Sequence, residues 1–155
     1  MSDTNQGFKI NDIKIFCSSH ATEDIEKVKQ SMLHLIPEDH RNSVEIINIP
    51  IEGHAGNPII LLELKITQQR KINDALAFIA EKLDDIDKEI IAEELDNRIG
   101  EDNCLYLRFN KQDAYNEILK LDNMDNTIRY AIKFIIYKTA DNIIQQVLTS
   151  HKIII

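Results

Sequence analysis

Apolar side chains recur along the chain with two different periods, and these periods predict the order of its elements. Alternation of apolar and polar residues predicts five strands, over residues 8–17, 44–51, 59–67, 104–110 and 127–138, the last of them the longest. Spacings of three and four residues predict helices over 22–36, 72–83, 86–99 and 140–148, with a short helix or turn over 111–120. The predicted order is therefore β-α-β-β-α-α-β-(α)-β-α.

The strand patterns also predict how the layers are arranged. Each predicted strand is apolar on one side and more polar on the other, so helices should cover one face of the sheet and leave the other more open. We therefore expect an α+β fold with a single, mostly antiparallel or mixed sheet and helices packed mainly on one face. A chain of 155 residues without repeats or linkers fits one domain, 1–155, with a loose N-terminal tail over 1–7.

Two helix starts carry recognisable capping signals. Thr22 stands before the first helical run and is its predicted N-cap, followed by Glu23 and Asp24 where the helix dipole favours acids. The pair Asp84 and Asp85 precedes the third helical run and should cap it.

The charge of the chain is concentrated in one segment. Lys and Arg number 18 against 26 Asp and Glu, and a formal net charge of −8 argues against an indiscriminate polyanion binder. Residues 84–102 hold nine acids and two bases, so this acidic segment carries −7 of that charge. We interpret it as a solvated helix face pointing away from any RNA, and the alternative is that it docks a basic protein partner.

The polar side of the predicted strands shows the opposite charge. It carries Lys14, Lys65, Arg108, Arg129 and Lys133, with Phe16, Tyr106 and Tyr137 at the same parity. Cations that hold phosphates and rings that stack on bases are what binders of single-stranded RNA need. If helices cover this face as well, the same side chains would only pack against those helices.

Motifs of catalysis and metal binding are missing. Cys17, His20 and His54 form the best candidate for a metal site, but no fourth ligand accompanies them. We therefore expect no metal, no cofactor and no enzyme, with an uncharacterised enzyme centred on His20 and His54 as the alternative. The sequence shows neither a signal peptide nor a membrane span, which predicts a cytoplasmic protein without a membrane partner.

A glycine-rich loop stands out in a chain with only four glycines. Residues 52–58 read Glu-Gly-His-Ala-Gly-Asn-Pro, and Gly53, Gly56, Asn57 and Pro58 each restrict or permit special backbone shapes. The loop is either a tight connection between strands or a backbone platform that holds a phosphate or a base edge.

Three motifs together carry a family resemblance. HATED at 20–24, EGHAGNPI at 52–59 and LYLRFNKQDAY at 105–115 resemble archaeal RNA-binding proteins described as predicted exosome subunits, and the resemblance spans about residues 14–148. It implies the α+β fold of the ribosomal protein that binds 5S rRNA, and RNA binding without catalytic residues. Asn110 stands where the family commonly has Asp. The motif residues of interest are His20, Thr22, Glu23, Gly53, His54, Gly56, Asn57, Pro58, Arg108, Phe109, Lys111 and Gln112.

Strand parity and the family motifs together predict a non-enzymatic RNA-binding protein. Its expected partners are RNA and components of the archaeal exosome or of RNA processing, and a homodimer stays open. The predicted RNA-binding residues are Lys14, His20, Thr22, His54, Gly56, Asn57, Lys65, Arg108, Lys111, Gln112, Arg129 and Lys133.

Overall fold

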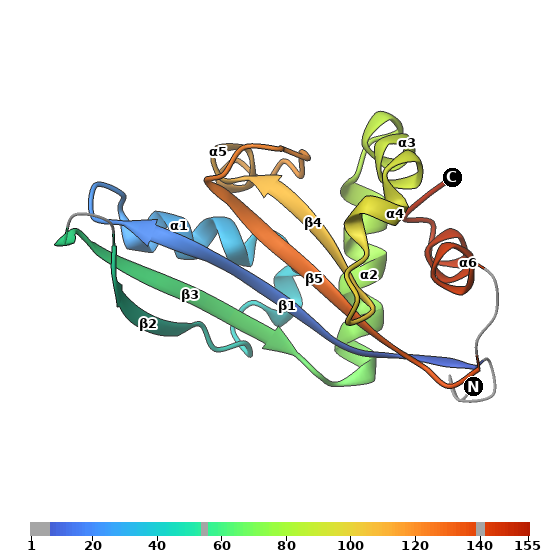
Figure 1. The fold of residues 1–155 in the computed structure, drawn as a ribbon. Coiled ribbons are helices and arrows are strands. Elements are labelled where there is room, and N and C mark those ends of the chain that lie inside the picture. The colour runs from blue at the N-terminus through green and yellow to red at the C-terminus, as the bar shows by residue number, and fades with distance from the viewer. Residues whose placement is uncertain (1–6, 54–55, 139–141) are drawn as a thin grey trace.

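Five antiparallel strands form one open sheet in the order β2-β3-β1-β5-β4 (Figure 1). The computed structural model describes residues 7–53, 56–138 and 142–155. The strands are β1 (Phe8–His20), β2 (Ile47–Glu52), β3 (Pro58–Ile66), β4 (Cys104–Asn110) and β5 (Thr127–Ile136). The predicted α+β class and the antiparallel sheet are thereby confirmed.

Helices connect the strands and lie mainly behind the sheet in the view of Figure 1. They are α1 (Ile25–Leu33), α2 (Gln69–Lys82), α3 (Asp85–Glu93), α4 (Leu95–Arg98), α5 (Lys111–Tyr115) and α6 (Ile143–Ser150), with a 3-10 turn η2 (Glu38–His40) after Pro37. The predicted helix over 86–99 is in fact two helices, because the backbone leaves helical geometry at Glu94 (φ −99°, ψ 13°).

The strand that we expected to be longest is not the longest. β1 has 13 residues and β5 has 10, because β1 continues to His20 past the predicted end at Cys17. β1 is the central strand, and it pairs with β3 on one side and β5 on the other. Beyond Phe16 the strand pairs with β3 alone, and this pairing keeps it extended as far as His20.

The apolar sides of the strands and helices make one core. Alternate residues of β1, β3, β4 and β5 are fully or almost fully buried, as Ile15, Leu64, Leu107 and Tyr130 show. Burying a side chain of this size contributes about 1.5–3 kcal/mol. The same alternation turns the intervening polar residues to the other face, as the sequence predicted.

The first helix is capped by a different residue from the one predicted. Asp24, not Thr22, is the N-cap of α1, and its carboxylate accepts a hydrogen bond from the Glu26 amide at 3.0 Å. Thr22 lies in the exposed turn before the cap. Asp84 caps α3 as expected, accepting from the Asp87 amide at 2.8 Å.

Some expectations fall on parts of the chain that the structure does not describe. His54, most of the predicted tail (1–6) and the first residues of the last predicted helix (140–141) lie outside the described residues. Within the described ranges, no helix is both long and apolar enough to cross a membrane.

Candidate nucleic-acid interface

The sheet face opposite the helices, which we call the open face, carries the predicted basic residues. The strand registers set Lys14 opposite Lys65, and they align Phe16, Arg129 and Arg108 in one row across β1, β5 and β4. None of the described helices crosses this face, which is turned toward the viewer in Figure 1. Strand parity therefore predicted the placement of all five bases.

Phe16 lies at the centre of the open face between two cations. The Lys14 ammonium lies 5.1 Å from the centre of the Phe16 ring, and the Arg129 guanidinium carbon lies 6.0 Å from it. Both distances are in the range of cation–π attraction. Lys14 also pairs with Glu63 at 3.5 Å, so part of its charge is compensated within the face.

Arg108 and Arg129 are direct cross-strand partners, one on β4 and one on β5. Like charges in this position destabilise a sheet, by about 0.2–1 kcal/mol for a typical pair. Across the described part of the chain, neither guanidinium has an ion pair or a hydrogen bond with another side chain. The pair therefore presents uncompensated positive charge to solvent.

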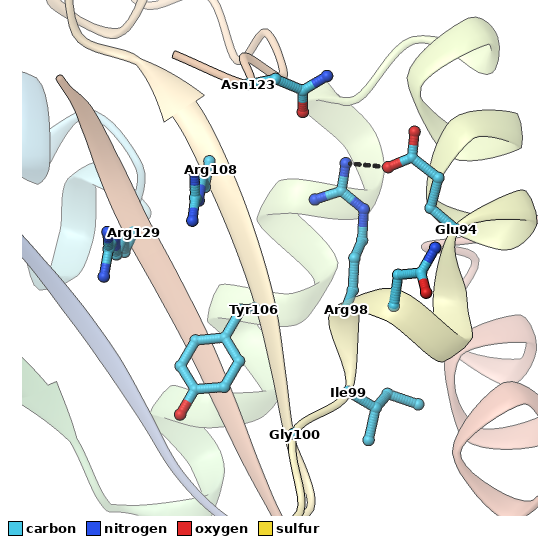
Figure 2. Close-up of a pocket in the computed structure, with 9 residues that line it drawn as sticks. Glu94, Arg98, Ile99, Gly100, Tyr106, Arg108, Asn123 and Arg129 are labelled. Atoms are coloured by element: carbon cyan, nitrogen blue, oxygen red, sulfur yellow. Dashed lines mark hydrogen bonds and ion pairs between the residues drawn. The ribbon is translucent and has the colours of Figure 1, made fainter. Parts of the chain in front are cut away.

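A hollow of about 440 Å³, here called the arginine hollow, opens beside this pair (Figure 2). Two short contacts with the outer edge of β4 bound it: Ile99 bridges Leu105, and Leu121 bridges Phe109. Its lining residues are Glu94, Asn97, Arg98, Ile99, Gly100, Tyr106, Arg108, Asn123 and Arg129.

Arg98 supplies a third guanidinium to the arginine hollow. It comes from α4, and its side chain is only 10% exposed. One terminal nitrogen donates to the Glu94 carboxylate at 2.9 Å, as Figure 2 shows. Its Nε is buried and has no hydrogen-bond partner among the described residues. A buried donor without a hydrogen bond lowers stability by about 1–3 kcal/mol, unless another group accepts a hydrogen bond from it.

A second hollow continues the first across the open face. It measures about 290 Å³ and shares Arg129 with the arginine hollow. Phe16, Ser18 and His20 from β1 line one side of it, and Asp125 and Asn126 lie on another. Together the two hollows form a path from the end of β1 to the edge of β4.

The lower end of β4 is held by Asp102. The Asp102 carboxylate accepts from the Cys104 amide at 3.1 Å and from the Tyr106 hydroxyl at 3.1 Å. The amide hydrogen bond, helped by Tyr106, holds the Asp102 pKa below its usual value. Burial, helped by Asp102, raises the pKa of Tyr106 to about 12. Tyr106 is therefore a neutral ring at physiological pH.

Lys133, a predicted RNA contact, also has a structural role. It donates a hydrogen bond to the Asp102 carbonyl at 2.7 Å and so holds the turn before β4.

Lys111, another predicted RNA contact, uses its charge inside the protein. Its ammonium donates to the Ser18 carbonyl at 2.6 Å, to both oxygens of Glu23 at 3.2 Å and to Asn126. The side chain is only 11% exposed. Its neighbour Gln112 is exposed and lines a separate hollow between α1 and α5. These two residues are therefore apart from the open-face cations.

The glycine-rich loop is a tight connection between β2 and β3. The Gly53 amide donates to the Asn57 carbonyl at 2.8 Å, and the Gly56 amide donates to the Gly53 carbonyl at 3.3 Å. Gly56 has φ +77°, which favours glycine, and a Cβ on Gly53 would collide with the Asn57 carbonyl and the Ile59 side chain. Gly56 and Asn57 are exposed.

The three family motifs meet at one end of the sheet. His20 of the first motif pairs with Ile59, the last residue of the second motif. Glu23 of the first motif is bound by Lys111 of the third, and its carboxylate accepts from the His20 amide at 3.0 Å. Partial burial acts to raise the Glu23 pKa, but the His20 amide and Lys111 outweigh it and lower the pKa. The motifs therefore build a structural junction as well as any binding surface.

The candidate metal set is not assembled by the residues that the structure describes. Cys17 points into the core, where burial raises its pKa to about 11, and His20 points to the open face from the same strand. His54 lies outside the described residues, and within the described ranges no three His, Cys, Asp or Glu side chains gather as metal ligands would.

The acidic segment is not simply a solvated face. Asp87 is only 1% exposed, and its carboxylate accepts from the Leu121 amide at 3.1 Å and contacts Lys120 at 3.4 Å. The expectation that this segment points away from the basic face is also wrong in part. Arg98 of α4 and Glu94, the cap residue before α4, line the arginine hollow, because the chain turns back along β4 after α4.

Arg98, Asn97 and Asn123 are the hollow residues that sequence reasoning missed. Arg98 is one of only two bases in the acidic segment and follows Glu94 by four residues, which suggests an ion pair within a helix. No local pattern places it against β4, because that position depends on the turn of the chain after α4. Asn123 is placed by pairing of residues 120–122 with β4, in which the Asp122 amide donates to the Arg108 carbonyl at 3.0 Å.

Comparison with known proteins identifies the family. A family model described as RNA binding matches residues 12–134, which include all of β2, β3 and β4, most of β1 and β5, and every residue that lines the arginine hollow. The chain belongs to this RNA-binding family. The resemblance to archaeal RNA-binding proteins is thereby confirmed, whereas the likeness to the ribosomal protein that binds 5S rRNA stays a prediction.

Three individual proteins are similar to most of the chain. RNA-binding protein PAB1135 of Pyrococcus abyssi is 33% identical over 79% of this chain and 80% of its own length. The uncharacterized protein MJ0213 of Methanocaldococcus jannaschii is 30% identical over 83% of this chain and 87% of its own. The crystal structure of AF2318 from Archaeoglobus fulgidus, a DUF54 protein, is 28% identical with a TM-score of 0.80, covering 92% of this chain and 99% of that one. These likenesses support the same fold over nearly the whole chain.

Proposed function

We propose that the protein binds single-stranded RNA across the open face. The observation that carries the proposal is the row of Phe16, Arg129 and Arg108 between the two hollows. Unpaired guanidinium groups attract phosphates, and exposed rings and guanidinium planes offer surfaces on which bases stack. Membership of the RNA-binding family supports the proposal, as does the similarity to RNA-binding protein PAB1135 of Pyrococcus abyssi.

The remaining open-face bases would extend the same path. Lys14 and Lys65 lie beside Phe16 on β1 and β3, and Lys133 lies toward the far end of β5. His20, Gly56 and Asn57 lie at the opposite end, where a strand of RNA would leave the sheet. The −8 charge of the whole chain makes general polyanion binding weak, so we expect selective and salt-sensitive binding.

The test compares Arg108→Gln plus Arg129→Gln with the wild type in titrations of an oligouridylate at several salt concentrations. The double variant should bind more weakly, and its plot of log K against log[salt] should be shallower by about 1.4, since each phosphate contact to a single strand contributes about 0.7. Thermal stability should change by no more than about 1 kcal/mol, because the substitutions remove a like-charge pair and one weak contact with Phe16 but no ion pair among the described residues.

Arg70→Gln is the matched control. Arg70 is exposed on α2, in the helical layer behind the sheet. It should leave the affinity and the salt slope as they are. If the double variant binds RNA like the wild type, or if the wild-type slope is flat, the open face is not the binding surface.

At the cellular level we propose a non-enzymatic role as an accessory of the exosome or of RNA processing. The family resemblance of the three motifs supports this role, and it predicts co-purification with exosome components that ribonuclease treatment weakens. The adaptor alternative has its own support in the exposed acids of α3, such as Asp85 and Glu89. Co-purification that resists ribonuclease and requires these acids would favour the adaptor.

A further inference from the structure

We infer that the arginine hollow binds the terminal phosphate monoester of an RNA strand. This inference rests on the proposed RNA binding across the open face and adds a preference for a phosphorylated end. The hollow of about 440 Å³ falls within the volume range of sites that hold small ligands.

The charge of the hollow fits a dianion better than an internal phosphodiester. Arg98, Arg108 and Arg129 contribute three positive charges and Glu94 contributes one negative charge, so the lining carries +2. Tyr106 is neutral near pH 7, as an ordinary tyrosine is, and adds no charge to the lining. A phosphate monoester carries about −1.5 to −2 charges near pH 7, whereas a phosphodiester carries one. A terminal phosphate therefore neutralises the hollow.

One unfavourable feature of the ligand-free site would be relieved by such an anion, and the same anion would also face the Arg98 guanidinium, which lines the hollow. Arg108 and Arg129 stand opposite each other without a carboxylate between them. An oxyanion can accept from all three guanidinium groups, and charge-assisted hydrogen bonds of this kind are among the stronger ones in proteins.

The position of the hollow fits the end of a strand. A strand of RNA that crosses the open face from β3 reaches β4 last, and α4 with residues 99–100 stands beyond the β4 edge (Figures 1 and 2). Tyr106 offers a ring beside the hollow, and Asn97 and Asn123 offer amides to the terminal nucleotide. The hollow thus has groups for a phosphate and for one base.

Glu94 occupies part of this site in the absence of a ligand. Its carboxylate takes one of the Arg98 donors at 2.9 Å, so a terminal phosphate has to compete with it. Glu94→Gln should remove the competitor and raise the hollow to +3. This variant should therefore bind a phosphorylated end more tightly than the wild type does, by about threefold to tenfold.

The experiment uses one oligouridylate in three forms, with a 5′-phosphate, with a 3′-phosphate, and with hydroxyls at both ends. Wild-type protein should bind one phosphorylated form about tenfold more tightly than the hydroxyl form. This difference corresponds to about 1.4 kcal/mol from charge-assisted hydrogen bonds to the phosphate. The form that gains affinity identifies which end of the RNA enters the hollow. Arg98→Gln should abolish the gain and keep the affinity for the hydroxyl form, and Arg98→Lys should keep part of it.

The outcomes separate the two proposals. If the wild type binds all three forms equally, the phosphate inference is overturned and RNA binding across the open face stands. If the preference survives Arg98→Gln, the phosphate lies elsewhere and the inference is likewise overturned. If no form binds at all, the proposed function itself fails. The wild-type measurement needs no substitution, so the test holds even if Arg98→Gln unfolds the protein.

Discussion

At the scale of single residues, a charge in a family motif does not have to face a ligand. Lys111 stands in the third motif and is a predicted RNA contact, yet its ammonium joins Ser18, Glu23 and Asn126 within the protein. It thereby links the end of β1, the start of α1 and the loop before β5. Its buried charge is a determinant of stability, which strand parity and motif matching do not reveal.

Lys111→Met tests this role. The substitution leaves the Ser18 carbonyl and the Glu23 carboxylate without their charged donor, so it should lower the free energy of unfolding by about 2 kcal/mol. Gln112→Met is the matched control, since Gln112 is exposed on the same helix, and it should change stability by less than about 0.5 kcal/mol. Equal stability of the two variants in urea unfolding would contradict the structural role.

The same junction has a pH signature. The His20 amide and Lys111 lower the pKa of Glu23 in the folded protein, although partial burial opposes them. A carboxyl group with a lowered pKa stabilises the fold above its unfolded pKa, and this contribution disappears as the pH falls through the folded value. The stability difference between wild type and Glu23→Gln should therefore be largest near neutral pH and shrink in acid.

At the scale of elements, the strands and their two faces could be predicted from the sequence, but the segments that pack along the outer edge of β4 could not. Alternation in β1, β3, β4 and β5 predicted both faces, because one side of each strand is buried and the other is not. The break at Glu94 and the return of residues 99–100 along β4 depend on contacts between distant segments. Arg98 reaches the open-face cations only through this return, so sequence patterns identified Arg108 and Arg129 and missed Arg98.

The helix α3 shows that the members of an acidic run are not equivalent. Asp87 is buried and accepts from the Leu121 amide, whereas Glu89 is exposed on the same helix. Asp87→Ala should therefore cost about 2–3 kcal/mol, because it leaves the Leu121 amide without its acceptor and removes one of the two carboxylates that contact Lys120. Glu89→Ala should stay within about 0.5 kcal/mol of the wild type. Chemical unfolding of both variants measures the contrast, and equal losses would rule out this role for Asp87.

At the scale of the whole molecule, positive and negative side chains occupy two different regions, and together they give the net charge of −8. The open face presents unpaired cations, and the acidic segment presents exposed carboxylates along α3 and α4. The arginine hollow lies where these regions meet. The field of the acids therefore opposes the approach of RNA from outside, and this opposition is strongest at low salt.

Neutralising four exposed acids tests this division. Asp85→Asn, Glu89→Gln, Glu93→Gln and Asp96→Asn together change the net charge from −8 to −4. We expect tighter RNA binding at low salt and a gain that fades as the screening length falls from about 10 Å at 0.1 M to about 3 Å at 1 M. An affinity for RNA that stays the same or decreases at low salt would contradict this opposition between the acids and RNA.

The strand order also has a consequence for how the chain acquires its fold. β1 lies in the middle of the sheet, and one of its two partners is β5, which is made last among the strands. Pairing of residues 8–16 with 129–136 closes a very long loop, and such non-local contacts make folding slow. While the chain is being synthesised, one edge of β1 stays unpaired until β5 leaves the ribosome. A nascent chain that ends before Thr127 should therefore be sensitive to proteases, and release of β5 is the step that protects it.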